Sequence, residues 1–207
     1  MGLQTRWLVV AKSWGMYMAD EQRVADPGPL GLAGFAMTTF CLSSANAGIW
    51  KGAGVAAALS LAFFYGGIAQ LLAGMWEFLR KNTFGALAFS SYGAFWLALY
   101  ALVNWQKAFG ANGSTGIFLL AWTIFTLYMT VAANKTTGAI LAVFVLLSIT
   151  FIFLTIGNWG AVDAHTSMVK IGGYTGLATA AAAWYASAAG VINDTHGRVV
   201  LPVGPRS

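Results

Sequence analysis

One long segment without charged side chains constrains the fold of this chain more than any other feature. No lysine, arginine, aspartate or glutamate interrupts the sequence between Asp26 and Lys51. A helix over Leu30–Trp50 would be about 31 Å long at 1.5 Å rise per residue, enough to cross the hydrocarbon core of a bilayer. Pro27 and Pro29 suit the first turn of a helix, and Asp26 complements its positive end. The segment therefore predicts a membrane-spanning helix.

The composition of the whole chain extends this prediction to an all-α membrane protein. Hydrophobic residues make up 58% of the sequence and charged residues 8%, whereas ordinary globular domains carry about 25% charged residues. We predict one six-helix transmembrane domain over residues 26–192, preceded by a cytoplasmic or interfacial segment (1–25) and followed by a cytoplasmic tail (193–207). The five spans expected after Leu30–Trp50 are Gly52–Leu79, Thr83–Trp105, Gly116–Ala133, Ala139–Ile156 and Ile171–Val191.

The charged residues indicate a membrane topology rather than a nucleic-acid partner. They are scattered at the ends of the spans, although the net charge is +5. Eight of the eleven lysines and arginines fall on one side of the predicted bundle, which places both termini in the cytoplasm. These eight are Arg6, Lys12, Arg23, Arg80, Lys81, Lys135, Arg198 and Arg206, against Lys51, Lys107 and Lys170 on the other side.

No pattern in the sequence is typical of an enzyme. No span contains paired carboxylates, and no glycine-rich phosphate loop follows a strand. With one cysteine and two histidines in the chain, we expect neither a metal site nor a cofactor. The spans instead carry neutral hydroxyl and amide side chains, which would hold a small anion weakly and release it quickly. Because an unpaired anion in a dry constriction is costly, this lining also suits proton-coupled passage.

Four blocks of sequence occur in an order known from one transporter family. They are DPGPLGLAGFAMTT from Asp26, FYGGIAQLLAGMWEF over Phe64–Phe78, KNTFGALAFSSYGAFW over Lys81–Trp96, and GRVVLPVG over Gly197–Gly204. Together they resemble the acetate uptake transporter family, also called the succinate–acetate permeases, whose first motif is usually NPAPLGL. The resemblance implies six transmembrane helices, a homo-hexamer with one pore in each protomer, and passage of acetate and other small carboxylates.

The resemblance also implies which residues line the pore. Phe35, Tyr92 and Leu147 resemble its hydrophobic constriction. Asp26, which replaces the usual asparagine, would repel a carboxylate at a pore mouth unless it is protonated or paired, and could equally be a proton site. For Glu77 we favour an ion pair with the following cations at the level of the headgroups, with proton handling as the alternative. The expected polar contacts with the substrate are Thr38, Thr39, Asn46, Gln70 and Ser91.

The sequence therefore predicts a transporter or channel for acetate and other short mono- and dicarboxylates such as succinate, linked to protons. Two other hypotheses stay open. The neutral lining would also suit a channel for small neutral amides such as urea. A non-transporting membrane sensor would have a sealed constriction and no flux. The sequence does not separate a channel from a carrier.

Overall fold

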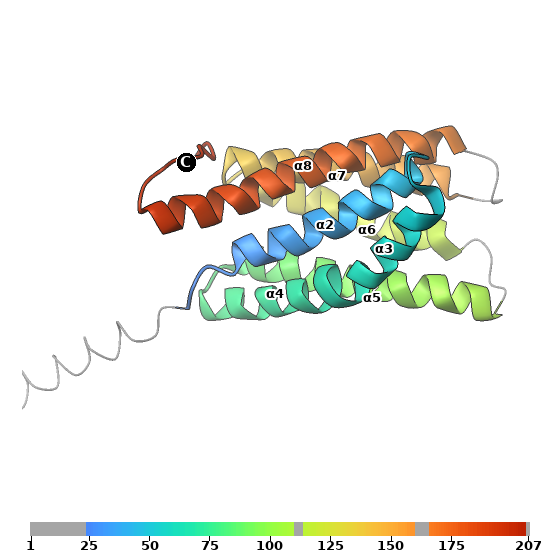
Figure 1. The fold of residues 1–207 in the computed structure, drawn as a ribbon, viewed down its shortest axis with the longest axis horizontal. Helices are drawn as coiled ribbons and strands as arrows, with labels where there is room; N and C mark the ends of the chain where they lie inside the picture. Colours follow the sequence, from blue (N-terminus) through green and yellow to red (C-terminus); the bar gives the residue numbers. More distant parts are fainter. Residues whose placement is uncertain (1–23, 110–113, 160–165, 206–207) are drawn as a thin grey trace, which may run out of the picture.

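The computed structural model describes residues 24–109, 114–159 and 166–205, and nearly all of them are helical. Most of the predicted N-terminal segment (1–25) lies outside these ranges. Within these ranges the chain forms six helical rods, which lie side by side in a bundle (Figure 1). The rods are α2 (Gly28–Asn46), a rod built from α3 (Lys51–Phe63), η1 (Phe64–Ala69) and α4 (Gln70–Leu79), then α5 (Thr83–Phe109), α6 (Ser114–Ala133), α7 (Gly138–Gly157) and α8 (Thr166–His196).

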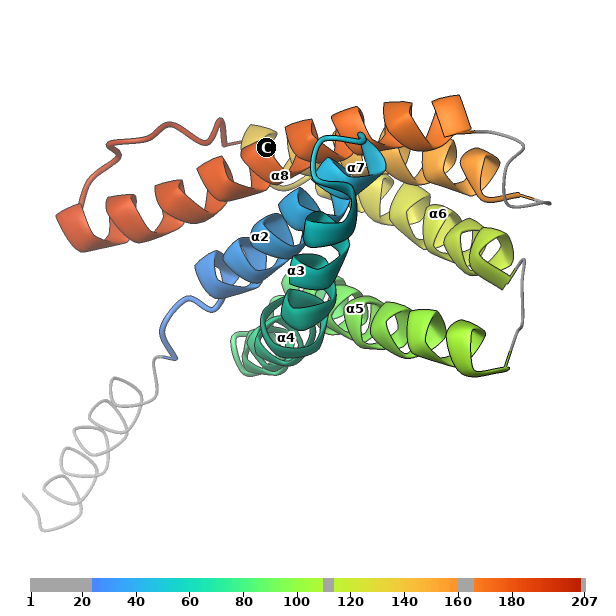
Figure 2. The ribbon, with the colours of Figure 1, turned by 45° about the vertical axis from the view of Figure 1, so that its right-hand side comes forward.

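Five of the six rods are long and apolar enough to cross a membrane. The exception is α2, in which glycine, serine and threonine dilute the apolar residues. Helix α2 packs against α8, α3, η1 and α4, and Figure 2 shows it between α8 and the α3–α4 rod. Its polar residues Thr38, Thr39, Ser43 and Ser44 are buried. The chain is thus an all-α membrane protein in which a rod with several buried hydroxyl groups lies among the others.

Helix α2 ends earlier than the span predicted over Leu30–Trp50. It stops at Asn46 rather than Trp50, because Gly48 adopts φ +84° and its N–H donates to Ala45 O over 2.9 Å. The N–H of Ile49 donates to Ser44 O in the same turn. A glycine in the left-handed conformation is a common end of an α-helix, since it satisfies the last carbonyls without a side-chain clash.

The second rod contains a π-helical segment, η1, that the sequence analysis does not predict. Here α2 and η1 approach closely, and glycines on both helices make this possible. A Cβ added to Gly34 would lie 2.7 Å from the carbonyl oxygen of Tyr65, and one added to Gly66 would lie 2.5 Å from Thr38 Oγ1. The wider π turn ends directly before Gln70. Such segments are frequent at functional sites of membrane and soluble proteins.

The C-terminal residues are more ordered than the predicted polar tail suggests. Helix α8 continues to His196, and the following residues fold back to the start of α7. There the N–H groups of Gly138 and Ala139 donate to the carbonyls of Gly204 and Val203 over 2.7 and 3.0 Å. The first N–H groups of a helix have no partner within the helix, so the tail caps α7 from outside.

Candidate functional site

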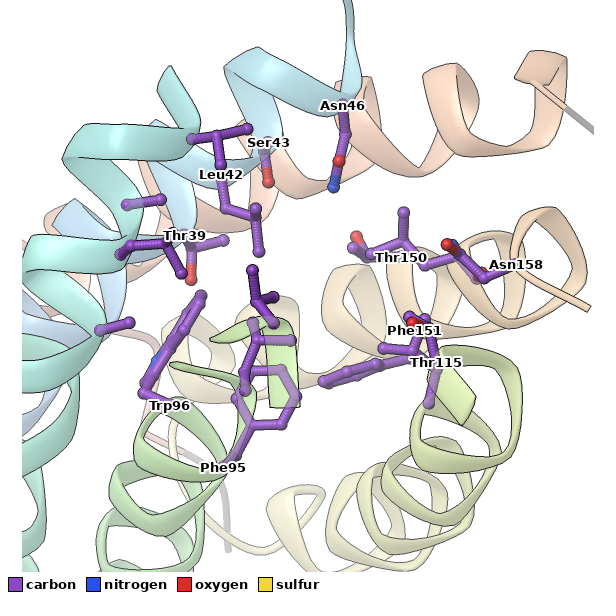
Figure 3. Close-up of a pocket in the computed structure, with 18 of the residues that line it drawn as sticks. Thr39, Leu42, Ser43, Asn46, Phe95, Trp96, Thr115, Thr150, Phe151 and Asn158 are labelled. Atoms are coloured by element: carbon purple, nitrogen blue, oxygen red, sulfur yellow. The ribbon is translucent and has the colours of Figure 1, made fainter. Parts of the chain in front are cut away.

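Three cavities follow one another along the axis of the bundle. The first, the wide cavity, has a volume of about 240 Å³ and lies near the end of α2 and the start of α6. Figure 3 shows Thr39, Ser43 and Asn46 of α2 facing Thr150 and the other labelled residues of α5, α6 and α7 across it. Most of its lining is apolar. Its hydroxyl and amide groups include those of Ser43, Asn46, Thr115 and Asn158. Such a lining suits a small molecule with one polar and one apolar end.

The second, narrow cavity has a volume of about 30 Å³, close to the share of one water molecule in the liquid. Gln70 and Tyr92 are among the residues that line it, but the atoms that face the cavity are all apolar. Phe35 and Leu147 line both the wide and the narrow cavity, so these two side chains form the boundary between them.

The third, the mouth cavity, has a volume of about 390 Å³ and opens at the opposite end of the bundle. It shares four lining residues with the narrow cavity, namely Leu32, Phe84, Phe89 and Ile140. Charged side chains enter its wall: Asp26, Glu77 and Arg80. The order along the bundle is therefore wide cavity, narrow cavity, mouth cavity.

The three residues expected at the constriction converge at the narrowest of these cavities. Phe35, Tyr92 and Leu147 are 5%, 3% and 4% exposed, and all three line the narrow cavity. The ring centroids of Phe35 and Tyr92 are 5.8 Å apart. The Tyr92 hydroxyl shares a hydrogen bond of 2.9 Å with Thr126 Oγ1 of α6, which fixes the ring across the bundle. The result is an apolar layer between two more polar cavities.

Two buried polar atoms beside this layer have no hydrogen-bond partner among the described residues. One is Oε1 of Gln70, a residue that lines the narrow cavity and whose side chain is 1% exposed. Thr39 Oγ1 lies at the wide cavity, on the other side of the layer. A buried polar group without a partner costs about 1–3 kcal/mol. Both positions therefore favour a water molecule or a passing polar ligand.

Three of the five expected polar contacts line the cavities and two do not. Thr39 and Asn46 line the wide cavity, and Gln70 lines the narrow one. Thr38 lines none of the three, because its hydroxyl donates to Gly34 O over 2.8 Å and the side chain faces Gly66 of η1. Ser91 is half-buried and also lines none of them.

Helix α7 and the residue after it contribute a stripe of cavity-lining residues, two of them polar, that the sequence analysis missed. Thr150, Phe151, Leu154 and Asn158 line the wide cavity together with Leu147. The signal was present, because positions three, four, seven and eleven residues after Leu147 share one face of a helix. The Thr150 hydroxyl donates to Leu146 O over 2.9 Å, and its oxygen also lies 3.0 Å from Thr175 Oγ1 of α8. Its oxygen is thus already engaged between α7 and α8.

The two acids at the mouth cavity differ in their surroundings. Asp26 forms an ion pair with Arg80, and its Oδ1 also accepts the N–H of Gly28 over 2.9 Å. Glu77 is 2% exposed, and its Oε2 accepts Asn82 Nδ2 over 3.0 Å. The start of α5 covers the Glu77 carboxyl, since a Cβ added to Gly85 would lie 2.8 Å from it, and the guanidinium of Arg80 contacts Asp26. The ion pair expected for Glu77 at the level of the headgroups therefore stays a prediction.

The sequence and the fold are similar to those of known proteins. The chain is 42% identical to acetate permease A of Emericella nidulans (91% of this chain, 69% of the relative). It is 38% identical to the succinate-acetate/proton symporter SatP of Escherichia coli K12 (88% and 96%). Its fold matches the structure of the bacterial acetate channel SatP with a TM-score of 0.81 at 39% identity, covering 88% of this chain and 100% of that chain. Residues 12–206 match the model of the GPR1/FUN34/yaaH family, and the chain belongs to that family.

Proposed function

We propose that this protein passes acetate and other short mono- and dicarboxylates, such as succinate, through the three cavities of each protomer. The observation that carries the proposal is the convergence of Phe35, Tyr92 and Leu147 on the narrow cavity, with Phe35 and Leu147 at its boundary with the wide cavity. Relatives named as an acetate permease and a succinate-acetate/proton symporter support the choice of substrate.

The walls suit conduction better than tight binding. Hydroxyl and amide groups of the wide cavity, including Thr39 and Asn46, would bind a carboxylate without a fixed cation. The apolar layer then offers no partner for a charge, so the neutral acid crosses it at a lower cost than the anion. Because the protonated acid crosses at the lower cost, the flux of the substrate is coupled to the movement of protons. Asp26 and Glu77, at the mouth cavity, are the candidate proton sites.

We place the protein in the plasma membrane with both termini in the cytoplasm, so that the mouth cavity faces the cytoplasm and the wide cavity faces outward. The positive-inside rule and the family resemblance support this placement. The same resemblance supports a homo-hexamer with one pore in each protomer. Apolar side chains exposed on the outside of the bundle, such as Ile117, Ile124 and Val131, would contact lipid or a second copy.

Uptake of labelled acetate into proteoliposomes tests this function. We expect uptake above that of protein-free liposomes, a further rise with an inward proton gradient, and inhibition by excess succinate but not by excess urea. Inhibition by urea without inhibition by succinate would instead favour the amide channel, to which the neutral lining of the wide cavity is also suited. Folded protein that conducts neither solute would refute transport and favour the sensor.

A further inference from the structure

The mouth cavity contains a pair of hydrogen-bond donors that already hold a carboxylate of the chain itself. Arg80 Nη1, at the end of α4, and the N–H of Gly28, at the start of α2, both donate to Asp26 Oδ1. Guanidinium groups bind carboxylates by charge-assisted hydrogen bonds, and a helix N-terminus adds a favourable dipole. These two donors therefore already bind a carboxylate group, that of Asp26.

A dissolved carboxylate can reach the same donors. Asp26, Gly28 and Arg80 all line the mouth cavity of about 390 Å³, and the side chains of Arg80 and Asp26 are 35% and 50% exposed. Among the described residues that line this cavity, Arg80 alone carries a positive charge. The guanidinium is therefore the strongest attraction for an anion along the described route.

Two acids, Asp26 and Glu77, lower the affinity of the mouth cavity for anions. A Cβ added to Gly28 would lie 3.0 Å from Asp26 Oδ1 and 3.7 Å from Glu77 Oε1, so both carboxyls flank the start of α2. Glu77 is held by Asn82 rather than by Arg80. Asp26 is thus the carboxylate that neutralises the guanidinium.

We propose that Arg80 and the Gly28 N–H form a carboxylate-binding site at the mouth, and that Asp26 competes with the substrate for it. The inference rests on the proposed function. A substrate carboxylate replaces Asp26 on the two donors, and Asp26 later displaces the substrate. An internal competitor weakens binding and speeds release, which conduction requires.

Equilibrium exchange of labelled acetate across proteoliposomes tests the competition, because exchange kinetics do not depend on the orientation of the inserted protein. Asp26→Asn keeps an oxygen for the Gly28 N–H but removes the negative charge from Arg80. We expect its KM for acetate to fall by up to about fivefold, the change that corresponds to an exposed ion pair. Arg80→Gln should raise KM, and the double variant should lie between the two single variants.

Two matched controls separate this site from general surface charge. Asp194→Asn and Lys81→Gln make the same charge changes at exposed positions that do not line the mouth cavity. Both should leave KM within about twofold of wild type, since isolated surface charges contribute little. Thermal unfolding in detergent checks that every variant is folded.

The outcomes separate the two proposals. If wild-type protein exchanges acetate but Asp26→Asn leaves KM unchanged, raises it, or lowers it no more than Asp194→Asn does, the competition is refuted and the proposed function stands. If folded wild-type protein exchanges no acetate, the proposed function is refuted and the inference falls with it.

Discussion

Phe35→Ala is the most informative change at the constriction. The Phe35 ring borders both the wide and the narrow cavity and packs against Tyr92 at a centroid distance of 5.8 Å. A molecule that crosses from one cavity to the other must move this ring away from Tyr92. An aromatic pair of this kind is worth about 0.5–1.5 kcal/mol, so removal of the ring should raise the rate of acetate uptake about 2- to 12-fold.

The same substitution should relax the size limit. The narrow cavity has a volume of about 30 Å³, and loss of the ring would join it to the wide cavity. Uptake of labelled butyrate should therefore rise more than uptake of labelled acetate. Phe151→Ala is the matched control, because Phe151 is 4% exposed but lines only the wide cavity of the two. Both variants should lose stability, by about 3–5 kcal/mol on the scale of soluble cores.

The ratio of butyrate to acetate uptake shows whether Phe35 separates the wide cavity from the narrow one. The account predicts a higher ratio for Phe35→Ala and an unchanged ratio for Phe151→Ala, both measured on protein that elutes as one species and unfolds cooperatively. An equal change in the two variants, or no change in Phe35→Ala, would refute Phe35 as the boundary between the cavities.

Three further changes test other parts of the structure. Gly34→Ala would place its Cβ 2.7 Å from the carbonyl oxygen of Tyr65, so thermal unfolding in detergent should show a loss of about 1–3 kcal/mol, while Gly52→Ala, with nothing within 4 Å, should be neutral. Gln70→Leu should slow acetate uptake about 2- to 12-fold, the value of one lost hydrogen bond to the passing molecule; undiminished uptake would argue against that contact. Asn193→Ala removes the contacts that hold the C-terminal tail, so hydrogen exchange at the tail amides should accelerate, and unchanged protection there would contradict this role.

The helices were largely predictable from the sequence, because charged and turn-forming residues mark their ends. The span predicted over Thr83–Trp105 begins where α5 begins, and the one over Ala139–Ile156 differs from α7 by one residue at each end. The end of α2 was missed because Gly48 terminates it through backbone conformation rather than through charge. The π-helical turns of η1 were also missed, since they depend on close packing against Gly34 and leave no period in the sequence.

The site was predictable where a side chain's direction follows from its motif, and less so where neighbours decide it. Phe35 and Tyr92 meet as expected, and Leu147 joins them. Thr38 and Thr39 are adjacent, yet about 100° apart around the helix axis, so one faces η1 and the other a cavity. Their roles depend on how α2 is rotated in the bundle, which a single sequence does not reveal.

The central claim is that the substrate passes between Phe35, Tyr92 and Leu147 inside each protomer. The most direct test is labelled acetate uptake by Leu147→Cys, made in a Cys41→Ser background, before and after reaction with a small methanethiosulfonate reagent. The account predicts that modification of the new thiol stops uptake and that saturating acetate slows the modification. Uptake that continues after mass spectrometry shows complete modification at position 147 would contradict this route.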